Sequence, residues 1–175
     1  MKICAIDLTY HPAGGAIEQI RQIIANVDAF SFDQVIFYTT KDNSILLKSA
    51  RNDKISAKTL WFSSSNLVLR TLWGQFIFPF RLLLEKIDVL FCPGNIAPIL
   101  CFKKKVQWIG TVGPFEKGFY KSRDVKGQII LYLNKWLMVL SSRTSDKVIF
   151  ESNYRPTRLL ESYRWIQQCS EDLYQ

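Results

Sequence analysis

The strongest constraint on the fold of this chain is a strand–helix–strand pattern within its first 40 residues. Residues 2–9 are a short apolar run closed by turn residues, which is typical of a buried parallel strand. Residues 16–29 repeat isoleucine and valine at helical spacings of three and four, and residues 34–40 are β-branched and aromatic. A chain that opens in this way is expected to build a parallel sheet with a crossover helix.

The same alternation continues along the chain. We expect further strands at residues 54–61, 87–92, 106–111 and 145–151, and helices at residues 44–50, 66–84, 128–143 and 154–166. The triplet Lys103-Lys104-Lys105 is expected to form a basic turn before the strand at residue 106. The predicted fold class is therefore α/β: a Rossmann-like, mostly parallel sheet with helices on both faces.

Residues 66–84 admit two interpretations. Leucines and aromatic residues crowd this segment, and Arg70 and Arg81 lie within it. Gly74 and Pro79 are expected to break it, which would leave it too short and interrupted to span a bilayer. It either forms a core helix with an aromatic edge or presents aromatic residues and arginines to a membrane surface.

Composition narrows the functional classes. The chain has 175 residues, a formal net charge of +8 and 48% hydrophobic residues, which excludes a disordered protein and favours anionic partners. The four cysteines form no CxxC pair, so we expect free thiols and no metal site. No nucleic-acid-binding motif occurs, and the N-terminus lacks the zones of a signal peptide. We therefore expect a cytoplasmic protein without a nucleic-acid partner.

The ligand site is expected where the strands end. Conspicuous loops at residues 14–15, 93–95, 110–114 and 152–153 each follow a predicted strand, and in a parallel sheet these ends share one edge. Gly14-Gly15 also opens a helix, whose free N–H groups favour a phosphate, although a glycine pair by itself fits an ordinary tight turn. The shared edge is a stronger prediction than any single loop.

Four segments in the expected order resemble the N-terminal, acceptor-side domain of a family 4 retaining glycosyltransferase of the GT-B fold. They are residues 14–18, 88–95, 108–115 and 145–154, and the resemblance covers roughly residues 1–160. It implies a Rossmann-like domain over residues 1–163, with residues 164–175 as an atypical tail where a linker and donor domain would begin. In that family a second domain grips the nucleotide sugar.

The resemblance also implies site residues. Gly14, Gly15 and Ala16 match the loop that approaches the donor phosphates. The acceptor-side cleft would be formed by Asn95, Gly110, Thr111, Val112, Lys117 and Tyr120. The position where family members often carry a histidine is Gly110, and the one histidine here, His11, lies in another loop, so no catalytic residue is assigned. No cofactor is expected beyond the nucleotide sugar that serves as substrate.

The implied activity is transfer of a sugar from a nucleotide sugar to a polysaccharide or lipid-linked acceptor, with peripheral contact to the inner face of a membrane. We expect no transfer by this chain alone. The alternatives are an inactive truncated fragment and a non-catalytic subunit of a split transferase that needs a separate donor-binding chain. A flavodoxin-like nucleotide binder is a further alternative, from a different functional class.

Overall fold

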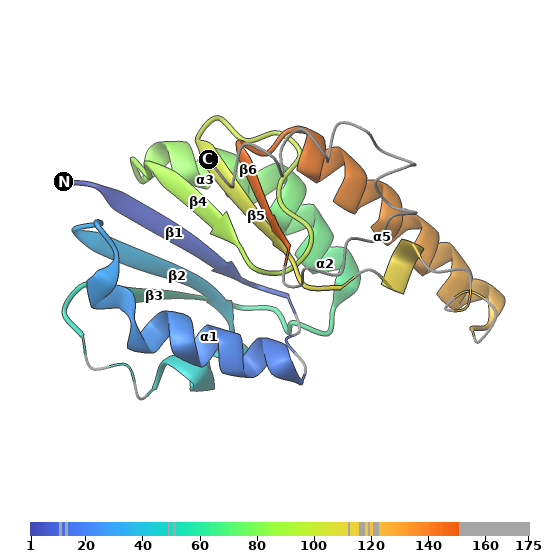
Figure 1. The fold of residues 1–175 in the computed structure, drawn as a ribbon, viewed down its shortest axis with the longest axis horizontal. Coiled ribbons are helices and arrows are strands. Elements are labelled where there is room, and N and C mark those ends of the chain that lie inside the picture. Colours follow the sequence, from blue (N-terminus) through green and yellow to red (C-terminus); the bar gives the residue numbers. More distant parts are fainter. Residues whose placement is uncertain are drawn as a thin grey trace.

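The computed structural model describes residues 1–150 except positions 11, 13, 49, 51, 112, 116, 117, 119, 121 and 122. Six strands form one sheet in which every neighbouring pair is parallel. The strands are β1 (Ile3–Leu8), β2 (Gln34–Thr40), β3 (Ile55–Leu60), β4 (Val89–Cys92), β5 (Lys104–Ile109) and β6 (Lys147–Phe150). The expected α/β class and parallel sheet are confirmed (Figure 1).

The helices connect these strands. The longer elements are α1 (Gly15–Ala25), α2 (Leu67–Leu72), the π-helical segment η3 (Trp73–Ile77), α3 (Phe78–Leu84) and α5 (Val125–Arg143). Short 3-10 turns are η1 (Val27–Ala29), η2 (Asn43–Leu47) and η4 (Gly113–Phe115). Helix α5 begins three residues before the expected start because Asp124 caps it, its side chain accepting from the Gly127 N–H at 3.0 Å. The expected helix at residues 154–166 lies outside the described residues.

The strand order is β3-β2-β1-β4-β5-β6, and this order locates the ligand edge. The chain first adds β2 and β3 on one side of β1. It then returns to place β4 on the other side of β1 and adds β5 and β6 beyond it. Such a reversal creates a crevice outside the carboxyl ends of the two central strands. The order is that of the dinucleotide-binding sheets, whereas flavodoxin-like sheets follow 2-1-3-4-5. The flavodoxin-like alternative therefore loses its structural basis.

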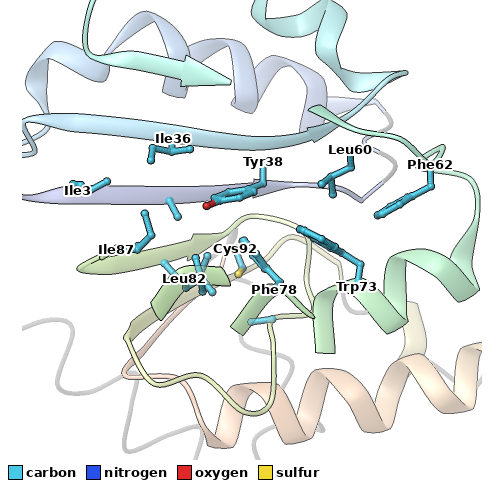
Figure 2. Packing of buried hydrophobic residues seen from close by; sticks show 13 residues of the cluster. Ile3, Ile36, Tyr38, Leu60, Phe62, Trp73, Phe78, Leu82, Ile87 and Cys92 are labelled. Carbon is cyan, nitrogen blue, oxygen red and sulfur yellow. The ribbon is translucent and has the colours of Figure 1, made fainter. Parts of the chain in front are cut away.

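Helices pack on both faces of the sheet because β1 alternates its side chains between them. Ile3 and Ala5 join a cluster with the buried side chains of α3 and η3, whereas Cys4 and Ile6 join a cluster with α1. Figure 2 shows the first cluster, in which Tyr38, Trp73 and Phe78 lie between the sheet and the helices. Helix α5 covers the same face further along, where Met138 packs on Ile109 and Val148.

A polar cluster fastens α3 to the strands beside it. The Glu85 carboxylate follows α3 and accepts hydrogen bonds from the Tyr38 hydroxyl of β2 and from Arg81 Nε at 2.8 Å. It also pairs with Lys58 Nζ of β3 at 2.5 Å. Burial alone raises the pKa of Glu85, but the hydrogen bonds from Lys58, Tyr38 and Arg81 outweigh burial and hold this pKa below its usual value. The charged form of Glu85 is the one that the fold stabilises.

The expected basic turn at residues 103–105 is wrong in part. Lys104 and Lys105 belong to β5, and the Lys105 side chain is fully buried. Its ammonium group donates to the Pro98 carbonyl and to Thr144 Oγ1, which compensates the loss of water. Burial lowers the pKa of Lys105. A run of three lysines predicts exposure to solvent. Because side chains alternate between the two faces of a strand, however, Lys105 points into the protein.

The expected break within residues 66–84 is also wrong. α2, η3 and α3 follow one another as a continuous helical run, because the N–H of Phe78 donates to Trp73 O in the i→i+5 pattern of a π-turn. Pro79, which has no N–H, then falls in the first turn of α3, where none is needed. The run Leu67–Leu84 is long and apolar enough to cross a membrane by length and composition, with a mean hydropathy of 1.3.

This helical run nevertheless lies flat on the sheet. Trp73, Phe78 and Leu82 are buried in the cluster beneath it, and its two ends lead from β3 and into β4 of the same sheet. Only 28% of the segment is buried, however. One side of the run therefore packs on the core, as the first interpretation expected, and the larger part of it is exposed apolar surface.

Candidate functional site

A pocket with both polar and apolar side chains lies at the crevice that the strand order creates. It is lined by the end of β1, by α2 and η3, by the loop after β4 and by Leu137 of α5. Its enclosed volume is about 50 Å³, and it reaches about 510 Å³ only when the space open to solvent is included. The pocket therefore combines four separate segments at the switch point of the sheet, where α/β proteins hold their ligands.

Asp7 brings a carboxylate to the floor of this pocket. It is the last residue but one of β1, it is 9% exposed, and it accepts a hydrogen bond from the Thr9 N–H at 2.9 Å. Burial raises the pKa of Asp7, while the Thr9 hydrogen bonds and the charge of Arg70 oppose that rise. A carboxylate that lines a pocket is suited to accept hydrogen bonds from ligand hydroxyl groups.

Arg70 of α2 brings the opposite charge to the same pocket. Its Nη1 donates to the Ser64 carbonyl at 3.2 Å, which fixes the guanidinium group. Burial lowers the pKa of Arg70, and the charge of Asp7 opposes this effect. No ion pair within 4.0 Å joins Asp7 and Arg70 among the described contacts, so the two charges act on one another across the pocket. A guanidinium group in such a position suits a phosphate or carboxylate.

The π-helical segment holds the opposite wall in place. Gln75 donates through Nε2 to the Ala97 carbonyl at 3.2 Å, and its Oε1 accepts from the Ile99 N–H at 2.9 Å. These two bonds tie the loop after β4 to η3. π-Turns occur frequently at functional sites, and here Gly74 and Gln75 of the turn line the pocket.

The ends of β1 and β4 meet through a close contact that requires glycine. A Cβ atom built on Gly94 would lie 2.6 Å from Tyr10 Cδ1 and 2.7 Å from Tyr10 Cγ. The Tyr10 ring therefore packs directly on the backbone of the loop after β4. Burial, with the charge of Asp7, raises the pKa of Tyr10, so its phenol remains protonated.

Three of the residues expected in the acceptor-side cleft are brought together by hydrogen bonds. Asn95 Oδ1 accepts from the N–H of Gly110 at 2.7 Å and from the N–H of Thr111 at 3.2 Å. Asn95 itself has a left-handed backbone with φ of 66°. Its side-chain oxygen therefore fixes the chain after β5, and we assign Asn95 a positioning role at this edge.

Tyr120 is the other expected cleft residue that the structure describes. The Tyr120 hydroxyl donates to the Pro114 carbonyl at 2.8 Å, which anchors its own loop. Val112 and Lys117 lie outside the described residues, as does the loop at residues 152–153.

The structure places the expected donor-phosphate loop at the N-terminus of α1. Gly14 is the N-cap of α1 and has φ of 55° and ψ of −128°, which only glycine adopts readily. No side chain caps the helix, and a Cβ atom added at Gly14 or Gly15 would meet nothing within 4 Å. Ala16 follows in the first turn. Beside it, Gly15 and Trp108 of β5 line a second hollow between α1 and the sheet.

Asp7, Tyr10, Arg70 and Gln75 are site residues that the sequence pattern did not indicate. Asp7 is the one charged residue within the apolar run of β1, and that interruption is the signal that could have identified it. Arg70 likewise interrupts the apolar sequence of α2, and this interruption is the signal that could have identified it. Their pairing could not be foreseen, because it depends on how α2 crosses the end of β1.

The described residues contain no group of three or more histidine, cysteine or acidic side chains able to hold a metal ion. Cys4 and Cys92 are buried free thiols and Cys101 is half-buried, as the sequence predicted. No family model, curated protein or solved structure matched the chain.

Proposed function

We propose that this chain is the acceptor-side domain of a glycosyltransferase that acts on a polysaccharide or lipid-linked acceptor. The observation that supports it is the pocket at the switch point, in which the carboxylate of Asp7 and the guanidinium group of Arg70 face a common space. Hydroxyl groups of a sugar require acceptors such as a carboxylate, and a sugar that carries phosphate requires a cation. The pocket offers both.

In this proposal Asp7 accepts hydrogen bonds from acceptor hydroxyl groups, and Arg70 binds an anionic group of the acceptor. Asn95 holds the backbone of Gly110 and Thr111 at the rim. The open N-terminus of α1 at Gly14 receives the phosphate of a nucleotide sugar. In this proposal the rest of the nucleotide sugar is gripped by a donor-binding domain.

Calorimetric titration of the full chain tests this proposal, with glucose 1-phosphate and glucose as probes. Binding of glucose 1-phosphate should weaken about tenfold or more in Arg70→Met, because a charge-assisted hydrogen bond contributes about 1.5–3 kcal/mol. Asp7→Asn should weaken the binding of both probes. Arg21→Met, which removes an exposed arginine of α1 outside the pocket, serves as the matched control.

A chain that binds neither probe, or binds both equally well in all three variants, would contradict the proposal and favour the inactive-fragment alternative. A second measurement concerns the donor side. The 175 residues alone should not release nucleotide from a nucleotide sugar, and turnover by these purified residues would refute a donor site supplied by another domain or chain.

A further inference from the structure

We propose that the outer side of the helical run Leu67–Leu84, together with the tip of the loop between β4 and β5, is a surface that docks on an anionic lipid bilayer. We call it the bilayer-docking surface, and it consists of Leu72, Phe76, Phe80, Leu84, Leu100 and Phe102, each of which is 47% exposed or more. Contiguous apolar surface of this kind on a monomer marks an interaction site.

The helix contribution is a stripe along one side. Leu72, Phe76, Phe80 and Leu84 follow one another at intervals of four residues, while Trp73, Phe78 and Leu82 face the sheet. With 3.6 residues per turn, a four-residue series drifts around an α-helix. The wider π-turn at Trp73–Ile77 turns the series back, so the stripe remains on the outer side.

The loop after β4 extends this stripe. The rings of Phe80 and Phe102 lie 6.2 Å apart between centroids, which joins the helix to the loop. Leu84 is 83% exposed and Leu100 is 67% exposed. None of the six residues lines either of the two pockets described above.

The charges around this surface favour an anionic bilayer as the occupant. Residues 66–104 carry five basic and two acidic residues. Lys86 lies two positions after Leu84 and Lys103 follows Phe102, and no ion pair joins these two lysines to the described acidic residues, whereas Lys104 in β5 alternates to the other face of the sheet. Glu85 is engaged by three partners, as described above, and Asp88 accepts from the Ile3 N–H at 2.7 Å. The uncompensated charge is therefore positive.

The residue types distinguish a bilayer from a protein partner. Lysine is depleted at protein–protein interfaces, whereas leucine, phenylalanine and lysine together are typical of helices that lie in the membrane interface. The pocket lies on the same helical run, because Arg70, Gly74 and Gln75 line it. A chain docked in this way holds its pocket beside the lipid headgroups. This inference rests on the exposed surface and does not require the proposed sugar chemistry.

Co-sedimentation of the full chain with vesicles tests the inference. The chain should bind vesicles made of equal parts of phosphatidylcholine and phosphatidylglycerol, and bind phosphatidylcholine vesicles weakly. Leu84→Ser combined with Phe102→Ser should lower the partition coefficient about tenfold or more, since both side chains leave water on docking. Lys86→Gln with Lys103→Gln should lower it about fivefold per lysine on the anionic vesicles only.

Matched controls come from the opposite face of the sheet. Ile45 is 63% exposed on η2, beside α1, and Lys48 is exposed at the end of the same turn. Ile45→Ser and Lys48→Gln should leave the partition coefficient unchanged. Circular dichroism and the melting temperature of each variant confirm that it is folded, so that loss of binding reports on the surface itself.

Three results would overturn the inference. The folded wild-type chain would fail to bind the anionic vesicles, or the control variants would weaken binding as much as the surface variants. Alternatively, sedimentation equilibrium would reveal a stable dimer that Leu84→Ser with Phe102→Ser dissociates, in which case the occupant is a second copy of the chain. Loss of sugar binding in any variant has no bearing on these outcomes.

Discussion

Replacement of Asn95 should separate two contributions that this residue makes to the free energy of unfolding. Its side-chain oxygen accepts from the backbone of Gly110 and Thr111, and its own backbone is left-handed. Each partly exposed hydrogen bond contributes about 0.5–1.5 kcal/mol, so loss of both costs about 1–3 kcal/mol. A left-handed backbone costs alanine about 1–2 kcal/mol more.

Three variants distinguish these effects. Asn95→Asp keeps both the acceptor and the tolerance of φ of 66°, and should be within about 0.5 kcal/mol of the wild type. Asn95→Gly keeps only the backbone freedom and should lose about 1–3 kcal/mol. Asn95→Ala keeps neither and should lose about 2–5 kcal/mol.

Urea unfolding at neutral pH, followed by circular dichroism, measures these differences as shifts in midpoint at constant slope. The order expected is aspartate, glycine and then alanine, from least to most destabilised. The reasoning is refuted if Asn95→Asp is as unstable as Asn95→Ala, because the acceptor oxygen would then make no contribution.

Three further predictions concern the same fold. Gly14→Ala should cost about 1–3 kcal/mol in urea unfolding because of its backbone angles, whereas Gly15→Ala, with open space around it, should be neutral or stabilise by up to about 1 kcal/mol. Gly94→Ala should cost about 1–3 kcal/mol through its clash with Tyr10, and combination with Tyr10→Ala should abolish part of that cost. The folded-state pKa of Glu85 is lowered, so its stabilisation is complete above the unfolded-state pKa of about 4.3 and is lost as the pH falls through the folded-state pKa. Unfolding measured against pH should have a shallower acid limb in Glu85→Gln, and an unchanged limb would contradict the role of this carboxylate.

Much of the architecture follows from local patterns. The strands β1 and β2 are apolar and β-branched along their whole length, because both faces of a parallel sheet are buried, and such runs identify themselves in a sequence. Alternation of these runs with helical periodicity then indicates a parallel sheet and its single ligand edge. The loops at Gly14 and Asn95 were predicted at that edge for this reason.

Other features depend on partners that are distant in sequence. The sequence predicts that β5 starts after the lysines, because nothing local indicates that the Lys105 ammonium group will reach Pro98 and Thr144. The continuity of α2 and α3 requires a π-turn, a rare element that Gly74 and Pro79 do not reveal.

The pocket charges are a similar case. Asp7 and Arg70 come from β1 and from a helix 63 positions later in the chain, and their opposition arises from the crossing of that helix over the sheet. The residues taken from the family resemblance were instead loop residues, and in the structure Asn95 and Tyr120 use their polar groups on neighbouring backbone. Sequence reasoning located the edge, and the structure added the charged side chains that make it a candidate binding site.

The most direct test of an acceptor site at this edge is chemical-shift mapping of the ¹⁵N-labelled chain with glucose 1-phosphate. We predict saturable shifts for the amides of Thr9, Gly94 and Gly110, with the shifts lost in Arg70→Met. Shifts confined to the hollow beside α1, shifts at the opposite edge near Lys2 and Asp33, or an unchanged spectrum would contradict the assignment of the pocket as the acceptor site.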